Sequence, residues 1–313
     1  MCQYERYLKA TMPIQTQLDD QRTSDDRASK QVLSVLVVGV LGISFLSLFA
    51  NVLWMNQVQY ASKAMLFFDV DQEKSLATWW ATVTLASLGV LAWFVGQKRT
   101  MTSFGERLGW WMLAFGFLFL SVDESCMLHE RIGGKTALGV DTPFEYARWI
   151  IVWLPVMGLF GGFIFWKMWR GSKRTVIGLT LGAVVFLAGA VGTEVINSKN
   201  RYAADSMTQE RLRLEATDFE ETQPLVFTGK ENYAYIAGTA IEEFLEMLGV
   251  VIWFWVMFRA RAEIKTPRRL QASLLEAKPL KITPAVAAGL ASKASTVTEL
   301  VSAIEEEEAR LGG

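Results

Sequence analysis

Two long uncharged runs constrain this chain more than any other feature of its sequence. Residues 31–62 and residues 75–97 contain no Asp, Glu, Lys or Arg. Each run is longer than the roughly 20 apolar residues that an α-helix needs to cross the hydrocarbon core of a bilayer. We therefore expect a multi-pass membrane protein of the all-α class.

Apolar segments of spanning length predict six transmembrane helices. They cover residues 32–55, 77–96, 108–130, 147–168, 175–198 and 234–258. We expect residues 1–31 to form an N-terminal tail without a cleavable signal peptide, because they are polar and the first apolar run is too long for one. Residues 259–313 should form a C-terminal tail that Pro267 interrupts, with a short amphipathic helix opening at the capping box Thr296 to Glu299.

The distribution of Lys and Arg predicts how these helices are oriented. Basic residues such as Lys98, Arg99 and Arg170 follow the second, fourth and sixth predicted helices, whereas the loops after the first, third and fifth lean acidic. Loops rich in Lys and Arg stay on the cytoplasmic side. We therefore expect a six-helix transmembrane bundle in the cell (inner) membrane with both termini cytoplasmic.

The rest of the composition excludes several kinds of site. His129 is the single histidine, so a bis-His haem, a three-His zinc site and the His-rich di-iron centre of membrane desaturases lack ligands. Cys2 and Cys126 are too few for a disulfide framework or a thiolate metal cluster. A net charge of −1 gives no general case for nucleic-acid binding. Any metal chemistry must therefore depend on carboxylates.

Acidic residues gather at the predicted outer ends of three helices. They are Asp123, Glu124 and Glu130 with His129 in the third helix, Glu194 in the fifth, and Glu242, Glu243 and Glu246 in the sixth. At 100° per residue, Asp123 and Glu130 share one helix face, and Glu124 and His129 project to opposite flanks of it. The predicted topology brings all of these acids into the same half of the membrane. This clustering is the strongest functional signal in the sequence.

Carboxylates inside a bilayer need compensation, since each costs roughly 2.5–3.5 kcal/mol near a helix centre. Protons, basic partners or bound cations can supply it. Because the acids outnumber the nearby bases, a divalent metal ion or a pair of them fits best, with Mn, Fe, Mg, Ca or Zn all conceivable. The alternative is a protonated network of hydrogen bonds and ion pairs that only fixes helix packing.

These residues predict a metal site with catalytic groups around it. The expected metal ligands are Asp123, Glu130, Glu242 and Glu246, and the expected further ligands or general acid–base groups are Glu124, His129, Glu194 and Glu243. The reaction would be metal-assisted hydrolysis or oxidation of a lipid or other amphiphile from the outer leaflet. Two alternatives are a cation or proton transport protein, in which the same acids line a conduit, and an accessory subunit of a larger membrane complex that docks through its charged tails.

The stretch Leu120-Ser121-Val122-Asp123-Glu124 followed by His129-Glu130 resembles a pattern in bacterial multi-span membrane proteins without a known function. This resemblance covers residues 32–258, implies a common six-helix fold and supplies no reaction. Glu242-x-x-x-Glu246 is similar to the acidic motif of undecaprenyl-pyrophosphate phosphatases, and Glu242-Glu243 to the start of the prenyl-protease glutamate motif. The further motifs of both families are missing here.

Two weaker patterns have simple interpretations. Glycines in the fourth and fifth predicted helices, at 158, 161, 162, 178 and 182, are expected to let helix backbones pack closely. The segment 56–74 is expected to lie at the membrane interface. Its Asp69-x-Asp71-x-Glu73 is similar to the opening of a calcium loop but lacks that loop's glycine and final glutamate.

Overall fold

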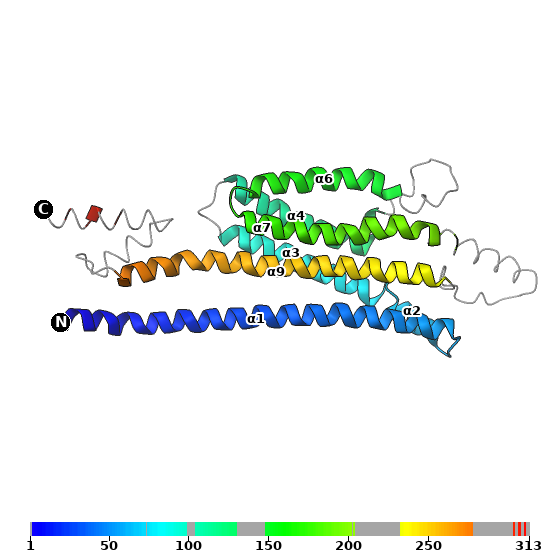
Figure 1. Ribbon diagram of the computed structural model, residues 1–313, viewed down its shortest axis with the longest axis horizontal. Helices are drawn as coiled ribbons and strands as arrows, with labels where there is room; N and C mark the ends of the chain where they lie inside the picture. Colours follow the sequence, from blue (N-terminus) through cyan, green and yellow to red (C-terminus); the bar gives the residue numbers. More distant parts are fainter. Residues whose placement is uncertain are drawn as a thin grey trace, which may run out of the picture. The chain divides into compact units, whose positions relative to one another are not determined.

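The computed structural model describes residues 2–72, 74–98, 104–129, 148–201, 203 and 232–277, together with residues 303, 306, 307 and 310. The expected all-α class is confirmed, because the described elements are seven α-helices and one π-helix (Figure 1). They are α1 (Cys2–Met55), α2 (Ala61–Phe68), α3 (Leu76–Lys98), α4 (Phe104–Cys126), α6 (Arg148–Met168), α7 (Lys173–Leu187), η2 (Ala188–Thr193) and α9 (Tyr233–Ala277).

Four described helical segments are long and apolar enough to cross a membrane. They are Thr23–Met55, Leu76–Lys98, Trp149–Met168 and Lys173–Arg201. These segments identify a multi-pass membrane protein, as the uncharged runs predicted. The two remaining predicted spans lie in α4 and α9, whose apolar stretches are interrupted by acidic residues of the predicted site. A count of six spans and their orientation therefore stay predictions.

Two boundaries differ from the sequence-based expectation, and one expected element cannot be compared. The third predicted helix ends at Cys126 instead of residue 130, because Met127 has a φ of 53°. This left-handed conformation cannot continue a helix. α9 passes through Pro267 and continues to Ala277, so the expected break at this proline is wrong. The capping box Thr296 to Glu299 lies outside the described residues.

The chain divides into two compact units. One unit comprises residues 1–32, 98–101 and 258–313, and within it Arg261 lies 3.6 Å from a carboxylate oxygen of Asp25. The other comprises residues 33–97 and 102–257 and contains every described residue of the predicted site. The predicted site therefore lies within a single compact unit, the second one.

Glycines allow α7 and α9 to pack backbone against backbone. A Cβ added at Gly249 would lie 2.9 Å from the carbonyl oxygen of Gly182, and one added at Gly178 would lie 2.6 Å from Cγ2 of Val256. The indole N–H of Trp253 donates to the carbonyl of Leu179 at 3.0 Å across the same contact. The packing interpretation is therefore confirmed for Gly178 and Gly182.

The three glycines of α6 behave differently. A Cβ added at Gly158, Gly161 or Gly162 would meet no described atom within 4 Å. The close-packing interpretation is therefore wrong for this helix, among the described residues. α6 instead contacts α4 through larger side chains, such as the rings of Phe119 and Trp153, whose centroids lie 5.5 Å apart.

The segment after α1 folds back onto that helix. Asn51 Nδ2 donates to a carboxylate oxygen of Asp69 at 3.1 Å, and the backbone N–H of Val70 donates to Ser47 Oγ at the same distance. Met65 of α2 is fully buried against Ala50. These contacts hold Asp69 and Val70 against α1. They therefore place Asp71, the next residue, at the end of the bundle where the acids of α9 begin.

Candidate acidic site

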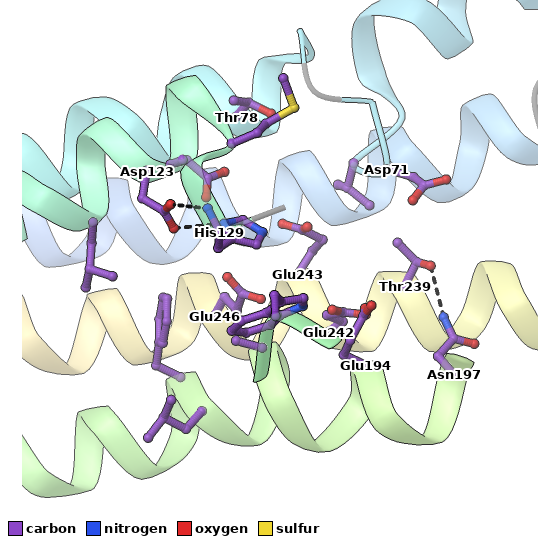
Figure 2. A pocket seen from close by; sticks show the side chains of 18 of the residues that line it. Asp71, Thr78, Asp123, His129, Glu194, Asn197, Thr239, Glu242, Glu243 and Glu246 are labelled. Atoms are coloured by element: carbon purple, nitrogen blue, oxygen red, sulfur yellow. Dashed lines mark hydrogen bonds and ion pairs between the residues drawn. The ribbon is translucent and has the colours of Figure 1, made fainter. Parts of the chain in front are cut away.

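One cavity collects the acidic side chains of the second unit. It has a volume of about 200 Å³ and is lined by residues of α3, α4, α6 and α9, the end of α7, and the loop after α2. Seven carboxyl groups line it: Asp71, Asp123, Glu124, Glu194, Glu242, Glu243 and Glu246. Figure 2 shows several of these side chains directed toward a common space from separate helices.

Seven of the eight predicted site residues line this cavity. They are Asp123, Glu124, His129, Glu194, Glu242, Glu243 and Glu246. Glu130, the remaining predicted ligand, lies outside the described residues. Asp71 was missed as a site residue, although its acidic loop was assigned to the same end of the bundle as the other acids. Its location at the same end of the bundle is the feature from which Asp71 could have been predicted as a site residue.

Asp123 and His129 form the best-defined pair in the site. The carboxylate of Asp123 accepts the backbone N–H of His129 at 2.8 Å, and its other oxygen lies 2.8 Å from Nδ1 of the same imidazole (Figure 2). The left-handed conformation of Met127 makes this possible, because it ends α4 and changes the direction of the chain before His129. The imidazole edge also meets the ring of Trp149 at a centroid distance of 5.1 Å. His129 is therefore held by Asp123 instead of projecting to the opposite flank of a longer helix.

The three glutamates of α9 face acids from other elements. The side chain of Glu242 lies beside that of Glu194 (Figure 2). The charge on Glu246 would be opposed by those of Glu243, Glu124 and Glu194, and that on Glu243 by Glu124 and Asp71. These side chains are only partly exposed. The arrangement places like charges together in a partly buried space, which is unfavourable unless protons or cations neutralise them.

A π-helix brings Glu194 to this position. Residues Ala188–Thr193 form η2, in which the hydroxyl of Thr193 donates to the carbonyl of Gly189 at 2.5 Å. Gly189 touches α9 so closely that an added Cβ would lie 2.7 Å from the carbonyl oxygen of Glu242. A π-turn inserts a residue into the helical repeat and so redirects the side chains beyond it, and such turns are frequent at functional sites. No pattern that we identified in the sequence predicted it.

Neutral polar groups complete one side of the cavity. The hydroxyl of Tyr235 donates to both carboxylate oxygens of Asp71, at 3.0 and 3.1 Å. Asn197 Nδ2 donates to Thr239 Oγ1 at 3.2 Å and lies 3.3 Å from the carbonyl of Tyr235 (Figure 2). These bonds connect the loop after α2, the segment after η2 and the start of α9 along one side of the cavity.

Comparison with known proteins identifies the family to which the chain belongs. Residues 32–260 match the protein family described as "Domain of unknown function (DUF8692)". The chain belongs to the DUF8692 family. No curated protein and no solved structure matches the chain. The expected resemblance to a family without a known function is thus supported over nearly the predicted range of residues. The match does not indicate which reaction, if any, the protein catalyses.

The match covers every residue that lines the acidic cavity, so this cavity belongs to the DUF8692 domain. The only basic groups among its described lining residues are Arg201 and His129. In the described parts of the chain, no three His, Cys, Asp or Glu side chains stand in the arrangement of a ready-made metal site. A metal ion would therefore have to draw these carboxylates inward, a movement that the three side-chain torsions of glutamate permit.

Proposed function

We propose that this protein is a membrane enzyme whose acidic cavity binds a divalent cation and uses it to hydrolyse or oxidise an amphiphile. One observation carries the proposal: seven carboxyl groups share a cavity of about 200 Å³ with only one arginine and one histidine among its described lining residues. Their charges need compensation, and hard or borderline divalent cations prefer oxygen ligands of this kind. Such a cation would also supply Lewis acidity for the reaction.

In this proposal the protein spans the membrane six times, with both termini in the cytoplasm. The acidic cavity then lies in the outer half of the bilayer, between the third, fifth and sixth spans. The charge pattern of the loops and the position of the acids near one end of α4, η2 and α9 support this orientation. A substrate would reach the cavity from the outer leaflet.

The geometry suggests distinct roles for the site residues. Asp123 is the group that orients His129, since it binds both the ring and the backbone of that residue. In many carboxylate–histidine–metal sites a carboxylate on one ring nitrogen orients the imidazole toward the metal ion, so His129 is also a proposed ligand. Glu242 and Glu246, one helical turn apart on α9, are the proposed carboxylate ligands. Glu124, Glu194 and Glu243 are the proposed further ligands or general acid–base groups.

Metal content tests the proposal directly. The full-length protein, purified in detergent and dialysed against Mn²⁺ or Zn²⁺ and then buffer, should retain a stoichiometric amount of metal by elemental analysis. Glu242→Gln and Glu246→Gln should lose most of it. Glu106→Gln is the matched control, because Glu106 is a buried glutamate of α4 that does not line the cavity. Wild-type protein that retains neither metal, nor Mg²⁺ or Ca²⁺ in the same assay, would refute the proposal.

A second function, proton or cation transport, is favoured by a different observation. Because the described carboxylates are not arranged as a ready-made metal site, protons can compensate them instead of a metal ion. In that case the protein in liposomes should pass protons or monovalent cations down a gradient, and Glu246→Gln should abolish the flux. Absence of flux in a preparation that binds metal stoichiometrically would leave the enzyme proposal standing alone.

A further inference from the structure

A second cavity adjoins the acidic one and has a different character. It has a volume of about 650 Å³ and lies between α4, α6 and α7, with Trp253 of α9 at its base. Its walls are almost entirely aliphatic and aromatic, and include Phe119, Phe160 and Ile164. The volume falls within the roughly 300–1,000 Å³ that is typical of ligand pockets.

The glycines of α6 account for this space. Gly158, Gly161 and Gly162 all line the cavity, and a side chain at any of them would meet no described atom within 4 Å. Gly158, Gly161 and Gly162 are exposed, so the cavity opens along α6 toward the surroundings of the helix. In a membrane those surroundings are lipid chains. An apolar ligand could therefore enter sideways without crossing water.

The apolar cavity shares part of its wall with the acidic one. Four residues line both of them: Leu120 of α4, Met157 of α6, and Phe186 and Leu187 of α7. Trp149, at one end of α6, borders the acidic cavity, and Gly161 borders the apolar one. The two spaces together have the form of an amphiphile site, with a polar compartment at one end and an apolar compartment at the other.

We infer that the apolar cavity binds the acyl chain of a single-chain amphiphile, whose head group lies in the acidic cavity. The position of the head group rests on the proposed function; that of the chain does not. A transmembrane helix of a partner is a poorer occupant. A helix about 10 Å across fills roughly 420 Å³ per turn, so the cavity would hold fewer than two of its turns.

Photocrosslinking tests this site in the full-length protein. The probe is a lysophospholipid with a diazirine in its acyl chain, added to protein in detergent, and the labelled residues are mapped by mass spectrometry. Label is expected on residues 113–120 and 153–165. Gly161→Leu, whose Cβ would meet no described atom within 4 Å, should occupy part of the space and reduce that label about tenfold, as loss of roughly 55 Å² of apolar contact predicts. Gly42→Leu is the matched control, because Gly42 of α1 also has no described atom within 4 Å of an added Cβ.

Three outcomes would overturn the acyl-chain site as a whole. They are equal labelling in wild type and Gly161→Leu, label spread over the exposed face of α1, and label replaced by crosslinks between two copies of the chain. The proposed function fails separately, through absence of bound metal. Glu242→Gln should lose metal and keep the chain label, whereas Gly161→Leu should keep metal and lose the label.

Discussion

At the scale of single residues, the site depends on a few side chains whose positions are fixed by hydrogen bonds. Asp123 holds His129 at two points, and Tyr235 holds Asp71 at two points. The first pair joins α4 to the turn that follows it, and the second joins the loop after α2 to α9. Each pair can be broken by a substitution that removes little volume, so its contribution can be measured by itself.

Asp123→Asn should weaken metal binding without unfolding the protein. The amide keeps the shape of the carboxylate, but it loses the charge that favours a proton on Nδ1 of His129, and with it the orientation of the ring. Loss of such a supporting carboxylate typically costs 10–100-fold in metal affinity. Titration of the purified protein with Mn²⁺ or Zn²⁺ measures this, with Ser125→Ala as control, since Ser125 is exposed near the end of the same helix. Unchanged affinity would show that Asp123 does not position the imidazole.

Tyr235→Phe should destabilise the second unit. The variant removes the hydroxyl that donates to Asp71 and leaves a carboxylate without this partner, at a cost of about 1.5–3 kcal/mol for a bond to a charged group. Thermal unfolding in detergent should show a lower midpoint. Tyr233→Phe provides the matched control, because Tyr233 is 75% exposed two residues earlier on the same helix. If both variants unfold at the wild-type temperature, the bond contributes nothing to stability.

At the scale of elements, the contact between η2 and α9 sets the position of Glu194 relative to Glu242. Gly189 allows it, because any side chain at this position would meet the backbone of α9. Gly192 lies three residues later in the same π-helix, where an added Cβ would meet no described atom within 4 Å. The two glycines therefore differ in packing but share a secondary structure.

Gly189→Ala and Gly192→Ala should change stability in opposite directions. The first must separate the two helices, because its Cβ would lie 2.7 Å from the Glu242 carbonyl and 3.0 Å from Cγ of Glu246. Overpacking of this kind typically costs about 1–3 kcal/mol. The second should be neutral or stabilising by up to about 1 kcal/mol, as expected for alanine in place of an unconstrained helical glycine. Thermal unfolding in detergent compares them, and equal midpoints would contradict the close contact.

At the scale of the whole molecule, orientation in the membrane decides which compartment the acidic cavity faces. The loop after α2 contributes Asp71 to the cavity, and the turn between α6 and α7 lies at the opposite ends of the helices that line it. The predicted topology places the first outside the cytoplasm and the second inside. Residues exposed in each position make this testable.

Cysteine labelling in intact cells should distinguish the two sides. In a background with Cys2→Ser and Cys126→Ser, a cysteine replacing the exposed Lys74 should react with a membrane-impermeant maleimide added outside. A cysteine replacing the exposed Arg170 should react only after lysis. The reverse pattern would place the acidic cavity on the cytoplasmic side and would invert the proposed route of substrate entry.

The sequence by itself determined the helical class, the membrane location and most of the acidic site. Uncharged runs of spanning length leave few alternatives to helices in a bilayer. Helical periodicity placed Glu242, Glu243 and Glu246 within one arc of their helix. The predicted topology placed Glu124 and Glu194 in the same half of the membrane as these three. These features depend on local composition and on a repeat of 3.6 residues, so they are visible without any knowledge of contacts.

Only the tertiary structure decided how these parts meet. The turn at Met127 returns His129 to Asp123, the fold of the α2 loop onto α1 delivers Asp71 to Tyr235, and η2 sets Glu194 against Glu242. Glycines recur at short spacing in both α6 and α7. Those of α7 pack closely against α9, whereas those of α6 leave open space beside the helix. The reason is that each outcome depends on which distant residue occupies the neighbouring space, and no local pattern encodes that.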